Sequence, residues 1–361
     1  MSIAYSAARL EKTIKNYEAW WRGELDRPLV PIILNGRNPG RSKPTVPLLT
    51  QATVHEWGYT AEQLIDRWDY ELSSYTYLGD SFPMLNFDLF GPGILGAFLG
   101  AVVDNSTGRI WFHKPRHVEP RDLHFTFDED NRWFLRIIDL YKAGQKRWQG
   151  QVVMGMADLG GVLDILATFL GTEELMMAFI DEPEEIKRLA AEIESLWRQY
   201  FNALSTYLDT PPGATNWTAL LSQRPMAVFQ SDVSYMMGQH HFREFVLPEL
   251  KRSCQRVERS IYHLDGVGEL KHLDDLLAIS ELDCIQWIPG AGMAHPRDWP
   301  EVYKKIRQGG KKLQIIGVDA LQGVMDTLGS GEGIDVREFE THPLKQEKEF
   351  KIMLEQWGIE A

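Results

Sequence analysis

Five short apolar runs in the chain each end on polar side chains, and this repeated pattern is the feature that most constrains the fold. The runs begin at Leu29, Val152, Met226, Ser260 and Leu313. In the second half of the chain, stretches with helical spacing separate one run from the next. Strands that alternate with helices predict parallel strands joined by helical crossovers, and therefore a (β/α)8 barrel or a doubly wound sheet.

The barrel is the favoured alternative, because no glycine-rich dinucleotide fingerprint or phosphate-loop lysine motif follows any of the runs. We predict an α/β protein with a single (β/α)8 TIM barrel over residues 27–361 and an N-terminal helical extension over residues 1–26. Two short strands around a polar turn between residues 109 and 127 predict a β-hairpin inserted in a loop. Helices are predicted over residues 5–24, 60–70, 128–149, 162–170, 183–207, 242–258, 270–279 and 300–308.

Composition excludes several classes of partner. The 361 residues are 44% hydrophobic, which is enough for a large core, and their net charge of −13 opposes attraction to nucleic acid or anionic lipid. The most apolar window, residues 89–103, is interrupted by glycines and is shorter than the ~20 residues that cross a bilayer. Only two cysteines are present, which suits a reducing compartment, so we expect a cytoplasmic protein.

The polar residues that follow the apolar runs are the candidate functional residues, because parallel barrels carry their chemistry at the carboxyl ends of strands. Polar residues after strands also cap the next helix, so both interpretations stay open for any single strand end. Trp287 lies before a glycine-containing loop, where it is predicted to underlie a ligand. The candidates at the ends of the five runs are Arg37, Arg41, Asp158, Ser231, Asp232, His263, Asp265 and Asp319.

Four segments together indicate a family. Residues 158–171, 181–189, 230–232 and 242–250 resemble, in order and spacing, the uroporphyrinogen-decarboxylase-like superfamily. Its members are (β/α)8 barrels that include tetrapyrrole decarboxylases and methyltransferases working with corrinoid proteins and thiols. The resemblance runs diffusely from about residue 27 to the C-terminus.

The decarboxylase branch has an Arg-x-x-Gly-Arg loop that grips substrate carboxylates, and this chain offers Arg37 to Arg41. The branch's aspartate that binds pyrrole nitrogens is similar to Asp80. Its tyrosine after the third strand appears here as Phe169, and its late Gly-His-Gly loop is replaced by residues 329–333. The resemblance implies substrate-binding roles for the arginines and Phe169, while a solvated basic loop remains the alternative for the arginines.

The methyltransferase branch holds zinc by a His-x-Cys pair and a distant cysteine, because zinc lowers the pKa of the attacking thiol. Here the pair is His263 and Asp265, so a carboxylate replaces the sulfur ligand. Carboxylate oxygens also bind zinc in proteins. Cys284 lies within an apolar strand, where a buried structural thiol is expected. We predict zinc ligation by His263, Asp265 and Glu269, with Asp158 and Asp232 as alternative completing ligands.

Methyl transfer at the barrel mouth is the favoured function, between a corrinoid (cobamide) carrier supplied by a partner protein or a small methyl donor and an acceptor such as a thiol. His263 and Asp265 would act on a metal or as an acid/base pair, with Asp158 nearby. The first alternative is metal-free decarboxylation of a tetrapyrrole or other polycarboxylate, with Arg37, Arg41 and Asp80 on the substrate. The second is a non-catalytic barrel that binds a tetrapyrrole or corrinoid. The resemblance to decarboxylases also implies a homodimer.

Overall fold

Five neighbouring parallel strands form the largest sheet of the computed structural model, which describes residues 3–208 and 213–361. In spatial order they are β11 (Ile334–Arg337), β10 (Lys312–Ile316), β9 (Cys284–Ile288), β8 (Arg259–Asp265) and β7 (Met226–Phe229). Most of their residues are buried, as expected for parallel strands covered on both faces. The α/β class predicted from the alternating pattern is therefore confirmed.

The remaining strands form small ladders. β1 (Pro31–Asn35) pairs parallel with β12 (His342–Pro343) and antiparallel with β2 (Tyr75–Gly79), while β3 (Met84–Leu85) pairs parallel with β6 (Val153–Met154). Single parallel bridges join Leu29 to Asp335 and Gly155 to Thr215. Within residues 3–208 and 213–361, these ladders do not join into one continuous hydrogen-bonded ring.

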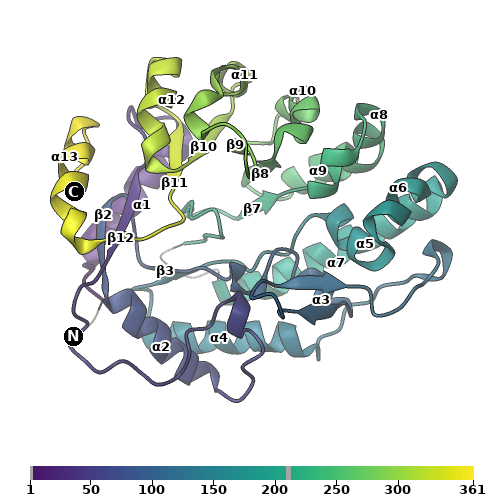
Figure 1. Cartoon of the computed structure of the whole chain (residues 1–361), viewed down its shortest axis with the longest axis horizontal. Coiled ribbons are helices and arrows are strands. Elements are labelled where there is room, and N and C mark those ends of the chain that lie inside the picture. The colour runs from purple at the N-terminus through teal and green to yellow at the C-terminus, as the bar shows by residue number, and fades with distance from the viewer. Residues whose placement is uncertain (1–2, 209–212) are drawn as a thin grey trace.

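Helices lie on both sides of the strands (Figure 1). In that view the helices from α8 to α12 follow the outer edge beside the five-stranded sheet, and α2, α4 and α7 lie along the opposite side, so the strands occupy the interior. The helices are α1 (Ala7–Arg22), α2 (Ala61–Ser73), α3 (Leu95–Phe98), α4 (Arg132–Trp148), α5 (Val162–Leu170), α6 (Thr172–Asp181), α7 (Pro183–Leu208), α8 (Gln239–His241), α9 (Leu247–Cys254), α10 (Leu273–Leu277), α11 (Pro300–Gln308), α12 (Leu321–Leu328) and α13 (Glu347–Gln356).

Local sequence signals explain where several helices begin. At the start of α2 the Thr60 hydroxyl accepts from the Gln63 amide, and the Gln63 side chain accepts from the Thr60 amide, which is a capping box. Helix α7 begins with Pro183 followed by two glutamates, which suit the positive end of a helix. The predicted helices at these places are confirmed.

Two predicted elements are wrong in detail. The inserted hairpin pairs β4 (Val102–Asp104) with β5 (Trp111–His113), so its first strand lies upstream of the predicted one. Residues 123–127 form no strand, and Leu123 and Phe125 are buried in the core instead. The helix predicted over 242–258 is divided into a π-helical turn (Phe242–Val246) and α9, with Pro248 at the junction, where a missing amide proton interrupts the regular ladder.

Helix α1 closes the amino-terminal side of the five-stranded sheet. The Trp20 indole donates to the carbonyl of Ile334 at 3.1 Å, and the Trp21 indole donates to that of Leu221 at 2.9 Å. Glu18 forms an ion pair with Arg259 at 2.6 Å. Since Ile334 and Arg259 are the first residues of β11 and β8, the opposite, carboxyl edge of the sheet is the one left for a functional site.

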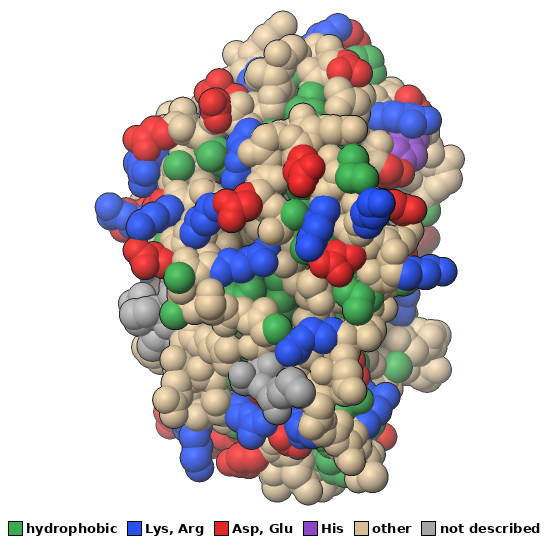
Figure 2. Space-filling view, turned by 90° about the vertical axis from the view of Figure 1, so that its left-hand side faces the viewer, with side chains coloured by type: hydrophobic (Ala, Val, Ile, Leu, Met, Phe, Trp, Pro, Cys, Tyr) green, Lys and Arg blue, Asp and Glu red, His purple; other side chains and the backbone are tan. Residues whose placement is uncertain are grey.

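The surface seen in Figure 2 mixes both signs of charge, with lysine and arginine interspersed among aspartate and glutamate and hydrophobic side chains scattered between them. In the part of the chain that the structure describes, no helix combines the length and apolar character needed to cross a bilayer.

Candidate metal and substrate site

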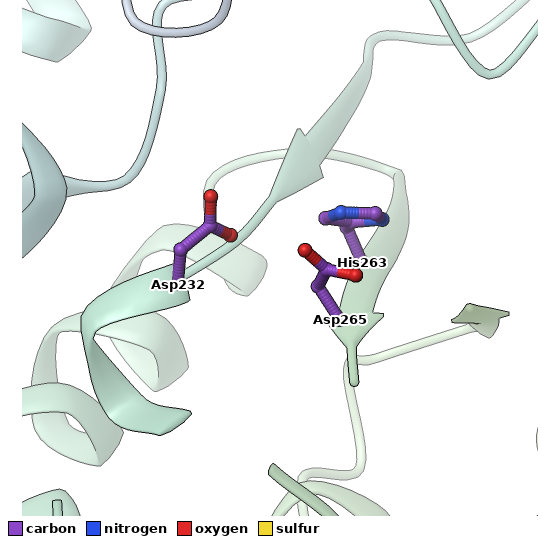
Figure 3. Close-up of side chains that lie close together, drawn as sticks. All are labelled: Asp232, His263 and Asp265. Carbon is purple, nitrogen blue, oxygen red and sulfur yellow. The ribbon is translucent and has the colours of Figure 1, made fainter. Parts of the chain in front are cut away.

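Three side chains predicted as strand-end candidates meet at the carboxyl edge of the sheet. One ligand-type atom from each of Asp232, His263 and Asp265 lies within 4.8 Å of the others. Figure 3 shows the three side chains pointing into a common space, with Asp232 on a short helical turn and the other two on one strand. The sequence-predicted His263 and Asp265 pair is thus joined by Asp232, one of the residues proposed to complete the site.

The parallel register brings these residues together. His263 and Asp265 are two residues apart on β8, so they point to the same face of the strand. Asp232 starts the 3-10 turn (Asp232–Met236) that follows β7 after two intervening residues, and β7 pairs in parallel with β8. The Asp164 carboxylate of α5 fixes this turn by accepting from the Asp232 and Val233 amides at 3.0 and 2.9 Å.

The surroundings raise the pKa of two acids at this edge into the neutral range. The Asp232 side chain reaches solvent, but the surrounding protein partly removes water from its carboxyl group. This desolvation, followed by the Asp265 charge, raises the pKa of Asp232 to about 7. Burial, followed by the Asp232 charge, raises the pKa of Asp164 to about 7 as well. Burial also lowers the pKa of His263 in spite of the Asp265 charge, so the imidazole is neutral at pH 7. Such opposed shifts are typical of functional sites.

Glu269, predicted as a metal ligand, lies outside the three-residue group found in the described part of the chain. It is fully buried, accepts from the Tyr262 hydroxyl at 3.3 Å, and its second oxygen has no hydrogen-bond partner in the structure. Burial and then the Asp232 charge raise its pKa to about 10. Glu269 is therefore held more firmly in the neutral form than Asp232, and only Asp232 lies within the group, so we favour Asp232 over Glu269 in that position.

A cavity of about 410 Å³ adjoins the cluster and shares Asp232 with it. Its walls come from the β5 end of the hairpin and from the loops after the strands. Gln230, Asp232 and Asp164 line it at the sheet edge. The hairpin contributes Arg109, Ile110, Trp111 and Phe112. This combination of aromatic walls with a few polar groups is typical of a site for a small organic ligand.

Two further predicted residues lie beside the cluster without entering it. Asp158 is buried, one carboxylate oxygen accepts from the Gly160 amide at 2.9 Å, and burial raises its pKa to about 7. Ser231 is buried directly before Asp232, and its hydroxyl has no hydrogen-bond partner in the structure.

The two arginines predicted to grip substrate carboxylates are bound by the protein itself. Arg37 donates to the carbonyl of Ser73 at 2.6 Å, and Arg41 pairs with Asp66 and Asp69 at 3.1 and 3.3 Å. Both guanidinium groups therefore hold the first loop against helix α2. Neither residue lines the cavity beside the cluster.

Asp80, predicted to bind pyrrole nitrogens, lies at the opposite edge of the sheet. β2 runs antiparallel to β1, and Gly79 pairs with Pro31, the first residue of β1. Asp80 is 1% exposed and pairs with Arg27 at 2.7 Å. The resemblance implied that Asp80 binds substrate, but the antiparallel direction of β2 places Asp80 at the edge where β1 begins.

The predicted aromatic contacts are also core contacts. Phe169 of α5 is buried and packs edge-on against Phe125, with the two ring centroids 4.7 Å apart. Trp287 is fully buried against Trp299, on the opposite face of β9 from Gln286. Cys284 is buried in β9 and burial raises its pKa, which confirms the structural thiol.

The sequence interpretation missed Asp164 and three polar residues inside the strands. Gln286, Gln314 and Asp335 are buried and stand at matching positions on β9, β10 and β11. The available signal was that each of these polar residues interrupts an otherwise apolar segment of the sequence. Asp164 lay within the segment 158–171, where it was passed over in favour of Asp158.

Comparisons with known proteins bear on the fold. No protein-family model matches the chain, and no curated sequence matches it. Among solved structures it is similar to a methyltransferase from Methanosarcina mazei, with a TM-score of 0.58 and 13% identity over 92% of this chain and 94% of that chain. The likeness therefore extends over nearly the whole of both chains, and at this identity it concerns the fold.

Proposed function

We propose that this chain is a methyltransferase built on a (β/α)8 barrel, with the cluster of Asp232, His263 and Asp265 as its reaction centre. The observation that carries the proposal is the convergence of these three side chains within 4.8 Å beside a cavity at the carboxyl edge of the sheet. The shared fold with a methyltransferase supports the class of reaction. The methyl group would pass between a corrinoid carrier on a partner protein and a small donor or thiol acceptor.

The order of the strands supports the barrel. The bridge from Leu29 to Asp335 extends the five-stranded sheet to the residues that lead into β1. β3 and β6 form a parallel pair, and Gly155 extends it to Thr215, ahead of β7. This order of neighbours is the one that a (β/α)8 barrel requires, and it supports the proposed barrel.

The donor set fits a divalent cation. One imidazole nitrogen and two carboxylate oxygens equal the number of protein ligands in catalytic zinc sites, which keep a further position open. Two carboxylates beside a neutral imidazole also give the negative charge that a dication balances. A bound zinc ion would lower the pKa of an acceptor thiol, so that the more nucleophilic thiolate is available at neutral pH.

The side chains around the cluster bind and orient the reactants. Trp111 and Phe112 provide apolar walls, and the volume of about 410 Å³ suits a small organic reactant. If the cluster acts without a metal, Asp232, with a pKa of about 7, can take a proton from an acceptor in the cavity at neutral pH. Asp164 holds the turn that presents Asp232.

The test combines metal analysis with a methyl-transfer assay. Protein purified without chelator is analysed for transition metals, and loss of methylcobalamin absorbance is followed in the presence of a small thiol. We expect about one metal ion per chain, and we expect Asp232→Asn and His263→Asn to reduce both metal content and rate at least tenfold. Asp319→Asn is the matched control, because Asp319 follows β10 but pairs with His295 at 3.0 Å outside the cluster.

Equal effects of Asp319→Asn and Asp232→Asn would contradict the assignment of the cluster as the reaction centre. If the wild-type protein contains no metal and His263→Asn transfers methyl groups at the wild-type rate, the proposed metal-dependent mechanism is contradicted.

A further inference from the structure

A row of polar side chains crosses four neighbouring strands beneath the cluster. His263, Gln286, Gln314 and Asp335 are partners in register on β8, β9, β10 and β11. Consecutive members are joined by hydrogen bonds of 2.5 Å. Gln286, Gln314 and Asp335 are at most 2% exposed. Little water therefore reaches these side chains to compete for their hydrogen bonds.

The direction of each hydrogen bond is determined from one end of the row. The side-chain nitrogen of Gln314 donates to the backbone carbonyl of Thr218 at 2.9 Å, and a carbonyl can only accept. The same nitrogen donates to Asp335. The Gln314 amide therefore turns its oxygen toward Gln286, whatever the protonation state of Asp335.

This orientation is passed on to the imidazole. Gln286 must present its amide nitrogen to the Gln314 oxygen, so its own oxygen faces His263. An amide oxygen only accepts, which requires a proton on Nδ1 of His263. In the neutral ring the lone pair then resides on Nε2.

We infer that Gln286 and Gln314 are positioning residues that fix His263 in the Nδ1–H tautomer and so make Nε2 the functional nitrogen of the cluster. Trp217 restrains the plane of the imidazole, because its ring packs edge-on against it with the ring centroids 5.0 Å apart. Trp217 directly precedes Thr218, so one buried segment both contacts the ring and anchors the Gln314 amide.

The role of this tautomer in methyl transfer rests on the proposed function, but the tautomer is measurable without activity. Histidine ligands of metals generally donate their second ring N–H to a neighbouring acceptor, and loss of that acceptor costs 10- to 100-fold in metal affinity. Gln286 would be this acceptor, oriented in turn by Gln314.

The test is the ¹⁵N–¹H long-range correlation spectrum of histidine-labelled protein at pH 8, with the His263 signals assigned by their loss in His263→Asn. We expect the Nδ1–H pattern in the wild-type protein, with or without bound metal. An Nε2–H pattern in the wild-type protein overturns the inference, and this measurement depends on no variant.

Variants at the row test its direction. Gln286→Met should allow a substantial population of the Nε2–H tautomer and weaken binding of zinc alone by 10- to 100-fold, whereas Gln286→Glu, which still accepts, should keep the Nδ1–H pattern. Gln322→Met, at an exposed glutamine on α12, is the control and should change neither. An unchanged tautomer in folded Gln286→Met overturns the inference. Absence of zinc binding in wild-type protein that shows the Nδ1–H pattern would instead contradict the proposed function.

Discussion

Removal of the Asp80 carboxylate should destabilise the protein without disturbing the proposed reaction centre. Asp80 accepts two hydrogen bonds from the Arg27 guanidinium, at 2.7 and 2.9 Å, one from Asn16 at 2.9 Å and one from the Val30 amide at 3.0 Å. The side chains of Asp80 and Arg27 are 1% and 17% exposed. Asp80→Ala leaves a largely buried guanidinium without its counter-charge, which typically costs about 3–5 kcal/mol.

The assay is equilibrium urea unfolding followed by the fluorescence of the twelve tryptophans. Asp66→Ala is the matched control, because Asp66 also pairs with an arginine, Arg41, but is 39% exposed, so its loss should cost less than about 1 kcal/mol. The double variant Arg27→Met/Asp80→Leu should be less destabilised than the sum of its single variants, since no unpaired charge remains.

A loss of less than about 1 kcal/mol in Asp80→Ala would refute the reasoning. So would a folded Asp80→Ala protein of normal stability that has lost ligand binding, because this would place Asp80 in the functional site.

Two further predictions concern the cavity and its surroundings. The pKa of Asp158 rises from an ordinary 3.8 to about 7 on folding, so the folded state binds this proton more tightly and stability falls as the pH rises through that window. Asp158→Asn should therefore stabilise the protein above pH 7, by at most about 4 kcal/mol. It should also flatten the dependence of the free energy of unfolding on pH. Equal slopes of the free energy of unfolding against pH in the two proteins would contradict this prediction. Trp111→Ser should raise KM for the organic substrate while changing stability by no more than about 0.5 kcal/mol, because this cavity-lining side chain is 55% exposed; an unchanged KM would remove the hairpin from the binding site.

The sequence predicts repeated elements well and strand direction poorly. The five apolar runs and the capping signal at Thr60 each appear in the structure near the expected residues. Asp80 was assigned to the substrate by resemblance, and the sequence around it does not reveal that β2 is antiparallel, because an antiparallel strand has the same local apolar pattern as a parallel one. Direction depends on pairing with β1, which is a tertiary property.

For the candidate site, too, local features could be predicted from the sequence and tertiary features could not. His263 and Asp265 are neighbours on one strand, so their proximity is a local property of the chain. Asp232 joins them only through the register of β7 with β8, and Gln286 only through that of β8 with β9. The sequence therefore indicated candidates at the strand ends, while the choice among Asp158, Asp232 and Glu269 required their three-dimensional separation.

The contacts of helix α1 have a consequence for the order of assembly. Trp20, Trp21 and Glu18 bind residues that are 314, 200 and 241 positions further along the chain. Helix α1 also contacts nearer residues, since Asn16 donates to Asp80, but these three contacts require residues 334, 221 and 259 to be in place. Closing such distant contacts is entropically slow, so the two tryptophans on this helix reach their final partners late in folding. Fluorescence from these rings would accordingly report the last stage of maturation rather than the first.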